Sequence, residues 1–284
     1  MRTLVLGGTG MLGQAVTLEG RRRGFPVLGL PREVADLTSP SALAGWMASF
    51  RPEVVINCAA YTKVDDCETR SEHAFAVNGE GAGNAARAAA SAGAHFLQVS
   101  TDYVFDGQAS EPYRPDSPVG PVSVYGASKL EGERQALAWE RTAVVRTSWL
   151  FGPGGPSFVA TIAGKVMRGE GPLRVVDDQV GGPTYSRFLA RALFDLAAKK
   201  ATGIFHYQNR GPVSWHGLAT AIAEALAPGF VVQPVATAEF PRPARRPAYS
   251  VLDVSGLESL LGRRVEPWSW GLAEHLQRLL GSEI

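Results

Sequence analysis

The stretch Thr3-Leu-Val-Leu-Gly7-Gly-Thr-Gly10-Met-Leu-Gly13 begins with a short apolar run and continues with glycines spaced three residues apart. A helical pattern from Met11 to Arg23 follows at once. Glycines at this spacing allow a tight turn, close approach of backbone N–H groups to a pyrophosphate, and close packing of the helix on the strand. The strand, the loop and the helix together predict a dinucleotide-binding site, and a plain glycine-rich turn is the alternative.

Short apolar runs alternate with longer helical patterns through the first half of the chain. The expected strands are Thr3 to Leu6, Val27 to Leu30, Val54 to Ile56, Phe96 to Val99 and Ala143 to Arg146. The expected helices between them are Met11 to Arg23, Ser41 to Phe50, Glu72 to Ala92 and Tyr125 to Glu140. Strands that are apolar throughout and separated by helices form a parallel sheet covered on both faces. The predicted fold class is α/β, a Rossmann-like doubly wound parallel sheet.

Prolines and glycines become frequent after about residue 150, as in Phe151-Gly-Pro-Gly-Gly-Pro156. Helical patterns remain at Ser157 to Arg168, Arg187 to Lys200, Trp215 to Ala227 and Trp270 to Leu280. We expect residues 1–150 to form an NAD(P)-binding domain. Residues 151–284 would form mainly a smaller substrate-binding lobe, with some segments returning to the first domain.

The helix expected over Glu72 to Ala92 contains Gly79, Gly81 and Gly83, each of which lowers helix stability. Glycines at such a cost indicate close packing rather than an exposed surface. We therefore expect this helix to lie tight against the sheet or a cofactor.

The composition excludes several classes of protein. Of the 284 residues, 45% are hydrophobic, which is enough for a sizeable core, and the formal net charge is +1. Acidic and basic residues are mixed, so there is no electrostatic case for nucleic acid or an anionic membrane as a partner. The apolar run at the start is too short for a signal peptide or a membrane span. Cys58 and Cys67 imply no disulfide framework, so we expect a cytoplasmic protein.

Tyr125 and Lys129, in Ser123-Val-Tyr-Gly-Ala-Ser-Lys129, stand four residues apart, which on a helix places both side chains on one face. A phenol has a pKa of about 10, so it acts as an acid or base at neutral pH only when a neighbouring cation stabilises its phenolate. The pair is a candidate acid/base group, and two solvated side chains are the alternative.

The glycine loop together with Tyr-x-x-x-Lys resembles the extended short-chain dehydrogenase/reductase superfamily. Four further segments are similar to the dTDP-4-dehydrorhamnose reductase family, and the resemblance covers essentially the whole chain. They are Asn57-Cys-Ala-Ala-Tyr-Thr-Lys-Val-Asp-Asp-Cys-Glu68, Ser100-Thr-Asp-Tyr-Val-Phe-Asp-Gly107, Val145-Arg-Thr-Ser-Trp-Leu-Phe-Gly152 and Arg246-Pro-Ala-Tyr-Ser-Val-Leu-Asp253. The resemblance implies NADPH as cofactor, with NADH as the alternative, and a dTDP-sugar as substrate.

The resemblance assigns catalysis to Thr101, Tyr125 and Lys129. Thr101 would donate a hydrogen bond to the substrate carbonyl, and Tyr125 would protonate the oxygen that becomes the alcohol. Lys129 would hold down the pKa of the phenol and bind the nicotinamide ribose, while the reduced nicotinamide supplies hydride. Nucleotide-sugar 4,6-dehydratases are similar but carry an Asp-Glu pair after the threonine. Here Asp102 and Tyr103 follow, so carbonyl reduction is the expected reaction.

Further positions carry over from the same resemblance. The residues expected around the cofactor are Gly7, Thr9, Gly10, Met11, Leu12, Gly13, Arg32, Asp36, Leu37, Ala59, Ala60, Tyr61, Tyr125 and Lys129. The residues expected around the substrate are Thr101, Asp102, Tyr103, Phe105, Trp149, Gln179, Tyr185 and Arg246. Arg246 is the candidate for the nucleotide diphosphate, and Gln179 and Tyr185 belong to a loop expected to close over the substrate. Simpler alternatives are a helix cap for Asp36, a solvated Arg32 and a core position for Trp149.

One departure from the family limits this carry-over. Some members are magnesium-bridged dimers that use a glutamate where this chain has Ala15. We therefore expect no metal site of that kind, and a homodimer stays open.

The expected activity is NAD(P)H-dependent reduction of the C4 ketone of dTDP-4-dehydrorhamnose to dTDP-L-rhamnose, for cell-surface polysaccharide. Two alternatives stay open. A dinucleotide-binding regulatory subunit, similar to that of methionine adenosyltransferase, has no use for the three catalytic residues. A nucleotide-sugar epimerase shares them but differs in the segments 100–107 and 246–253.

Overall fold

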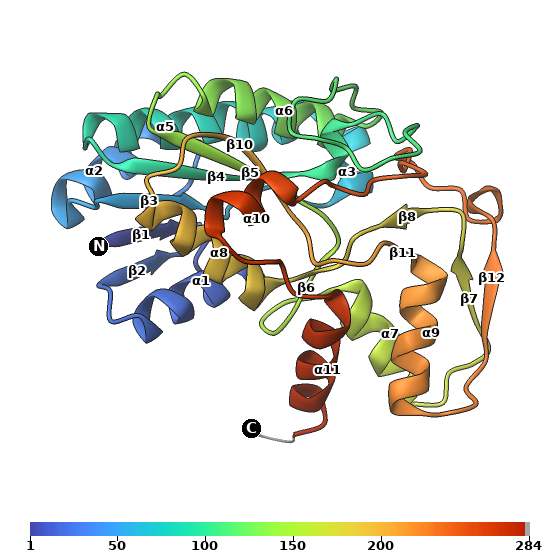
Figure 1. The fold of residues 1–284 in the computed structure, drawn as a ribbon. Coiled ribbons are helices and arrows are strands. Elements are labelled where there is room, and N and C mark those ends of the chain that lie inside the picture. Colours follow the sequence, from blue (N-terminus) through green and yellow to red (C-terminus); the bar gives the residue numbers. More distant parts are fainter. Residues whose placement is uncertain (282–284) are drawn as a thin grey trace.

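The computed structural model describes residues 1–281 and has a six-stranded parallel sheet at its centre (Figure 1). From one edge to the other, the strands are β10 (Gly203–Tyr207), β5 (Thr142–Thr147), β4 (His95–Thr101), β3 (Val54–Asn57), β1 (Thr3–Leu6) and β2 (Val27–Leu30). Each neighbouring pair is parallel, so that Val5 stands opposite Gly29 on one side and Ile56 on the other. The predicted α/β fold is confirmed.

Helices cover both faces of this sheet. The helices α1 (Met11–Arg22) and α8 (Ser186–Ala198) pack on one face, and α2 (Pro40–Phe50), α5 (Gly81–Ser91) and α6 (Val124–Ala136) lie on the other (Figure 1). Every residue of β1, β3 and β5 is buried, which explains why their sequences are apolar throughout instead of alternating. The expected helices and strands are present here, with ends displaced by up to a turn; α6 ends at Ala136, not at Glu140.

The strand order creates the crevice in which ligands bind to such folds. The chain leaves β1 for β2 on one side and then crosses over to β3 on the other side. The loops after β1 and β3 therefore diverge at the carboxyl ends of adjacent strands, and open α/β sheets bind ligands at this point.

The second half of the chain supplies β10, the sixth strand of the sheet, and a set of smaller elements. Its helices besides α8 are α7 (Phe158–Met167), α9 (Trp215–Leu226), α10 (Ser255–Leu261) and α11 (Trp268–Leu279). Its short strands pair as β6 (Leu150–Phe151) with β9 (Thr184–Tyr185), β7 (Leu173–Val176) with β12 (Val232–Val235), and β8 (Val180–Gly181) with β11 (Val213–Ser214). Strands of two to four residues are too short to show a period, so sequence analysis did not predict them.

The helix expected over Glu72 to Ala92 is divided into three parts. It consists of α4 (Ser71–Ala74), a π-helical segment (Phe75–Glu80) and α5, and a further short helix, α3 (Val64–Thr69), precedes it. A π-helical segment inserts one residue into the helix and is common near functional sites.

The glycines of this region serve close packing, as expected: Gly79 and Gly83 face α6, and Gly81 faces Leu37. A Cβ atom on Gly83 would stand 2.1 Å from Oε1 of Gln135 in α6. In the reverse direction, a Cβ atom on Gly132 of α6 would stand 2.1 Å from the backbone oxygen of Asn78. The helix also lies against the sheet, as expected, because alanines of α5 pack in one core cluster with Leu4, Val55 and Phe96 of the strands. The glycine contacts add a close approach between this helix and α6.

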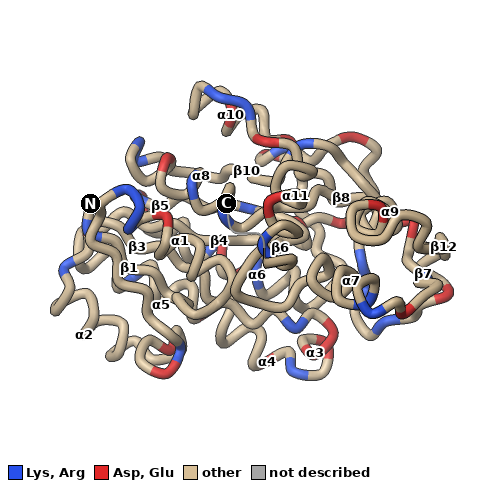
Figure 2. Tube along the Cα trace, turned by 90° about the horizontal axis from the view of Figure 1, so that it is seen from below, with Lys and Arg blue, Asp and Glu red and all other residues tan. Residues whose placement is uncertain are grey.

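Charged residues of both signs are interspersed along the chain, without a long run of one sign (Figure 2). Within residues 1–281, no helix has both the length and the apolar character needed to cross a membrane.

Replacing Gly132 with alanine tests the close contact between α6 and the backbone of Asn78. The added methyl group would clash with a backbone atom, which cannot rotate away, so Gly132→Ala should lower the free energy of unfolding by about 1–3 kcal/mol. Gly45→Ala is the matched control, because Gly45 is an exposed helix residue and a Cβ atom added to it would have no neighbour within 4 Å. That change should raise stability by about 0.5–1 kcal/mol. Urea unfolding measures both, and equal effects of the two changes would contradict the packing described here.

Candidate functional site

A pocket of about 200 Å³ lies across the carboxyl ends of β1, β2 and β3. It brings together residues that are far apart in the sequence and were expected around the cofactor: Gly7, Thr9, Gly10, Arg32, Asp36, Leu37, Ala59, Ala60 and Tyr61. Four lining residues were not expected, namely Ala35, Cys58, His73 and Val77. His73 and Val77 are four residues apart on a helical segment, so their shared face was a signal that sequence analysis did not use.

The glycine loop has the shape that a pyrophosphate needs. Gly7 has a left-handed φ of +74°, and a Cβ atom on Gly13 would stand 2.1 Å from the carbonyl oxygen of Gly7. Gly10 stands at the N-cap position of α1 and has no side chain, so no side-chain group bonds to the first N–H groups of the helix. A helix N-terminus of this kind binds phosphate through its N–H groups and its dipole. These residues therefore fit a dinucleotide.

Asp36 and Arg32 line this pocket but also bond to each other. Asp36 Oδ1 accepts hydrogen bonds from the backbone N–H and the hydroxyl of Thr38, and Arg32 Nε donates to Asp36 Oδ2 at 3.1 Å. These bonds hold the pKa of Asp36 below its usual value. The helix cap considered for Asp36 is wrong, because Ser39 stands at the N-cap of α2 and Asp36 instead closes a turn with Thr38.

Asn78 connects this pocket to α6. Its Oδ1 accepts a hydrogen bond from the backbone N–H of Tyr61 at 2.7 Å. Its Nδ2 donates to the backbone oxygen of Tyr61 and to the hydroxyl of Ser128, both at 3.0 Å. Ser128 lies in α6 beside Lys129, so the loop of the cofactor pocket and the helix with the candidate catalytic residues are fixed to the same side chain.

Tyr125 lies at the start of α6, next to the end of β4. Ser123 caps the helix, with its hydroxyl accepting a hydrogen bond from the N–H of Gly126. Gly126 allows the helix to approach the turn after β4, because a Cβ atom there would stand 2.1 Å from the backbone oxygen of Tyr103. The rings of Tyr103 and Tyr125 meet edge to face with centroids 5.5 Å apart, and the Thr101 hydroxyl faces the Tyr125 phenol. The structure brings Thr101 and Tyr125 together as predicted.

Burial controls the ionisation of the pair. It raises the pKa of Tyr125 well above its usual value, so the phenol keeps its proton at neutral pH. It lowers the pKa of Lys129 to about 8, although nearby Glu133 and Cys58 favour the charged form. Lys129 Nζ donates a hydrogen bond to the backbone oxygen of Val99 at 2.7 Å. The expectation that Lys129 holds down the pKa of the phenol is wrong for this geometry, because burial dominates.

Behind the site, Glu133 forms a buried ion pair with Arg146 of β5. Arg146 Nη2 lies 2.7 Å from Glu133 Oε2, and both side chains are almost inaccessible to solvent. Ser100, next to Thr101, donates its hydroxyl hydrogen to the other oxygen of Glu133. This network fixes the end of β4 relative to α6 and β5.

Arg246 reaches the same region from the C-terminal segment. Its Nη2 donates to Asp65 Oδ1 at 3.0 Å, and its guanidinium lies 5.9 Å from the centroid of the Tyr103 ring. Its Nη1 is buried and has no hydrogen-bond partner among the described residues. A guanidinium with a free donor suits an anionic group, so Arg246 remains a candidate for the nucleotide diphosphate.

Comparisons with known proteins agree with this geometry. The model of the RmlD substrate binding domain family matches residues 1–280. The chain belongs to this family. A dTDP-4-dehydrorhamnose reductase of Streptomyces griseus is 42% identical over 288 residues, which cover 99% of this chain and 94% of that protein.

Solved structures of similar proteins extend the match to three dimensions. A dTDP-4-dehydrorhamnose reductase of Clostridium acetobutylicum superposes with a TM-score of 0.94 at 39% identity and covers 99% of this chain and 100% of that one. A dTDP-4-dehydrorhamnose reductase of Bacillus anthracis, solved in complex with NADP, has a TM-score of 0.91 at 34% identity, with 98% and 99% covered. This RmlD family member therefore keeps the family fold over its whole described length.

Two residues that were expected at the substrate of this RmlD family member lie elsewhere. Tyr185 is fully buried in the core, and its hydroxyl donates to Glu274 of α11. Phe105 is also fully buried, where its ring stacks on that of Tyr113 with centroids 4.2 Å apart. Both predictions are wrong because neighbouring positions in a motif can face opposite sides of the backbone, and a motif does not show which side faces the site.

Trp149 and Gln179 are placed near loops of the second half. Trp149 has a left-handed φ of +47°, and its ring stacks on that of Trp215 at 3.4 Å. Gln179 is buried, and its side-chain amide nitrogen, Nε2, donates to the hydroxyl of Thr237. A bulky residue in the left-handed region is strained and often marks a functional position, so Trp149 stays a candidate for the wall of the sugar pocket.

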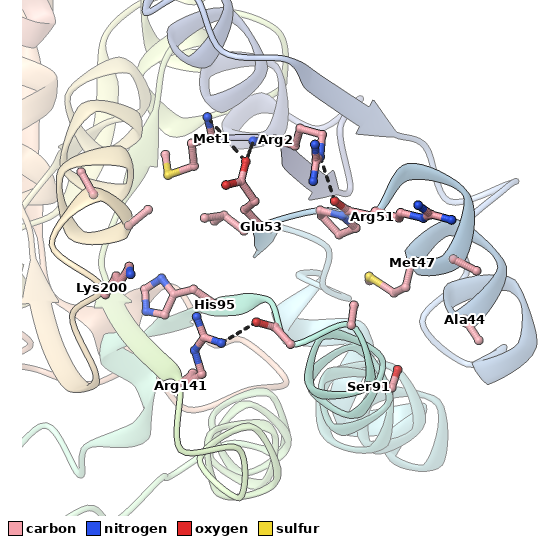
Figure 3. Close-up of a pocket in the computed structure, with 17 residues that line it drawn as sticks. Met1, Arg2, Ala44, Met47, Arg51, Glu53, Ser91, His95, Arg141 and Lys200 are labelled. Carbon is pink, nitrogen blue, oxygen red and sulfur yellow. Dashed lines mark hydrogen bonds and ion pairs between the residues drawn. The ribbon is translucent and has the colours of Figure 1, made fainter.

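A larger pocket, of about 870 Å³, lies at the opposite edge of the sheet, by the amino ends of its strands (Figure 3). Arg2, Arg51, Arg141 and Lys200 surround it. Arg2 Nε donates to the backbone oxygen of Arg51 after α2, and Arg141 Nη1 donates to that of Gly93 after α5. Arg2 and Arg141 thus bond carbonyl groups that follow helix ends, which gives these two charges a structural role.

A methyl group at Gly10 would test the cofactor pocket. Among residues 1–281 its one close neighbour would be Gly7 O at 3.4 Å, so Gly10→Ala should fold normally. The methyl group would occupy space at the start of α1, and the affinity for NADPH should fall at least about tenfold, or ~1.4 kcal/mol. Fluorescence titration with NADPH measures this, with Gly45→Ala as the control for an alanine elsewhere. Unchanged affinity in Gly10→Ala would show that the dinucleotide does not approach this loop.

Proposed function

We propose that the protein reduces the C4 ketone of dTDP-4-dehydrorhamnose to dTDP-L-rhamnose with NADPH. One observation carries this proposal: the half-buried phenol of Tyr125, which keeps its proton, lies next to Thr101 and Tyr103 at the carboxyl end of β4, on the same edge of the sheet as a glycine loop that fits a dinucleotide. The family relatives named as dTDP-4-dehydrorhamnose reductases support it.

The residues of the chain perform the proton chemistry of this reduction. When bound, NADPH supplies the hydride that adds to the ketone carbon. Tyr125 donates its proton to the ketone oxygen as negative charge develops there, and Thr101 donates a hydrogen bond to the same atom. Lys129, with a pKa of about 8, carries most of its charge at neutral pH and would hydrogen-bond the nicotinamide ribose, the other role that the resemblance implies for it.

Substrate binding would use the charged and aromatic groups around Tyr103. Arg246 has a free Nη1 donor for the diphosphate, and Asp65 keeps its guanidinium in place. Tyr103 occupies the position at which dehydratases have a glutamate, and a phenol with a pKa raised by burial cannot act as the base for elimination of water.

The choice of NADPH rests on two observations. The similar Bacillus anthracis protein was solved in complex with NADP. Arg32 lines the cofactor pocket after β2, with its guanidinium mostly exposed, so it is available to a ribose 2′-phosphate. The reaction would take place in the cytoplasm, which suits a protein whose two cysteines are free thiols.

The alternative functions have less support. A regulatory subunit that only binds a dinucleotide has no need for a protonated phenol at this edge of the sheet, whereas this chain has Tyr125 beside Thr101 there, with Lys129 one turn further along α6. An epimerase would share this trio, but the chain resembles reductases with 42% identity and the solved epimerase from Thermus thermophilus with 24%, a level that shows the fold alone.

Consumption of NADPH with a defined substrate tests the proposal. With dTDP-4-dehydrorhamnose, the purified protein should oxidise one NADPH for each dTDP-L-rhamnose formed, as measured by absorbance and chromatography. Tight binding of NADPH without oxidation would instead support the regulatory alternative. A nicotinamide that copurifies and is never consumed would support the epimerase.

Tyr125→Phe removes the proposed proton donor and little else. It should lower kcat by about 10²–10⁴-fold with the NADPH affinity nearly unchanged. Lys129→Ala should lower both kcat and the affinity for NADPH. Tyr185→Phe, which removes a buried hydroxyl from the core, is the matched control and should retain most of kcat. If Tyr125→Phe keeps wild-type turnover, another group donates the proton.

A further inference from the structure

The hydroxyl of Thr101 has a single hydrogen, and the structure already uses it. Thr101 Oγ1 donates to Asp102 Oδ1 at 2.9 Å and accepts a hydrogen bond from the backbone N–H of Tyr103 at 3.2 Å. A hydroxyl donates once and accepts twice. As long as Asp102 is a carboxylate it can only accept, so the Thr101 hydrogen points at Asp102 and cannot reach a ketone oxygen.

Asp102 lies in surroundings that disfavour its charge. Its side chain is 2% exposed, and its Oδ2 has no hydrogen-bond partner among the described residues. The Ser250 hydroxyl is close enough to favour the carboxylate but lies outside hydrogen-bond geometry with Oδ2. None of residues 1–281 forms an ion pair with Asp102, and burial raises its pKa to about 6.

The titratable groups around Asp102 come from four parts of the chain. Tyr125 faces it from α6, and Tyr103 follows it on its own turn. The pair of Arg246 and Asp65 lies beyond the Tyr103 ring, with the two charges compensating each other. Neither phenol carries a charge at neutral pH, because burial raises the pKa of both. No neighbouring cation among residues 1–281 therefore stabilises the carboxylate directly.

A proton on Asp102 would reverse the hydrogen bond without moving a heavy atom. The carboxyl group would donate to Thr101 Oγ1 across the same 2.9 Å. Thr101 would then accept from Asp102 and from the N–H of Tyr103, and its own hydrogen would be free to turn toward Tyr125 and the ketone oxygen. In this form the hydroxyl uses all its donor and acceptor capacity.

We propose that Asp102 is a positioning residue whose proton sets the direction of its hydrogen bond to Thr101, and that reduction proceeds through the form in which Asp102 donates. The proposal rests on the proposed function. Asp102 keeps its proton throughout: the hydride comes from NADPH, the proton on the product oxygen comes from Tyr125, and Thr101 contributes a hydrogen bond only.

The dependence of kcat/KM on pH tests the proposal in activity. From about pH 5 to about pH 9, wild-type kcat/KM should fall as Asp102 loses its proton, by up to about tenfold per pH unit above its pKa. Asp102→Asn has an amide that donates to Thr101 at every pH, so kcat/KM of this variant should not fall near pH 6. Above neutral pH the variant should turn over faster than wild type. Any fall near pH 8, where Lys129 titrates, should remain.

Two further variants assign the effect to this hydrogen bond. Thr101→Val should have a low kcat/KM that does not fall near pH 6, because the variant has no hydroxyl whose hydrogen Asp102 could redirect. Asp116→Asn removes the same charge from an exposed pair with Arg114 and should keep the wild-type profile. A profile of Asp102→Asn that still falls near pH 6, or a rate reduced equally at every pH, would overturn the proposal.

A measurement without turnover separates this proposal from the function on which it rests. In infrared difference spectra, the band of a protonated carboxyl group should titrate near pH 6 in wild type, be absent from Asp102→Asn and shift in Thr101→Val. This result would stand even if dTDP-4-dehydrorhamnose were not the substrate. Absence of such a band down to pH 5 would overturn the proposal directly, whether or not the variant enzymes are active.

Discussion

The buried amide of Asn78 fixes the distance between the cofactor crevice and the catalytic helix. It makes three hydrogen bonds, two to the backbone of Tyr61 and one to Ser128. Losing one of them in a buried site costs about 1–3 kcal/mol, so the geometry is strongly favoured. The carbonyl group of the same residue touches Gly132, which brings α6 into backbone contact with the π-helical segment. One residue thus places Tyr125 above the end of β4 and also shapes the wall of the cofactor pocket.

Burial determines the chemistry that this arrangement can perform. Desolvation acts on the half-buried phenol of Tyr125 and on the buried ammonium of Lys129 and carboxyl of Asp102, and in each case it shifts the pKa so that the neutral form is favoured. A ketone reduction needs an acid that keeps its proton until hydride arrives, and burial provides one. In contrast, an enzyme that abstracts protons would need a phenolate, which this site disfavours. At neutral pH the resting site therefore holds its phenol in the protonated form, which is the form that a ketone reduction begins from.

Sequence analysis succeeded where a structural requirement leaves a local pattern. The buried strands read as unbroken apolar runs, and the glycine loop follows from the space that a helix and a pyrophosphate need. It failed where the outcome depends on distant partners. The π-helical segment has the same composition as an α-helix, and the partner of its glycines, α6, lies about 50 residues further along the chain. Tyr185 and Phe105 were assigned to the substrate from their motifs, whereas packing turned both into the core. The direction of Lys129, toward Val99, likewise depends on the sheet and not on its spacing from Tyr125.

The stacked indoles of Trp149 and Trp215 have a consequence for optical work on this protein. Trp149 follows β5, the strand next to the edge strand β10, whereas Trp215 begins α9 in the outer part of the second half. Their rings are nearly parallel, with an interplanar angle of 6°. Two aromatic chromophores in such close contact share their excited states, so the pair contributes a circular dichroism signal that neither ring has alone. A displacement of α9 relative to the sheet would separate the rings and change that signal. The circular dichroism of this pair therefore reports on movement between the sheet and the outer part of the second half.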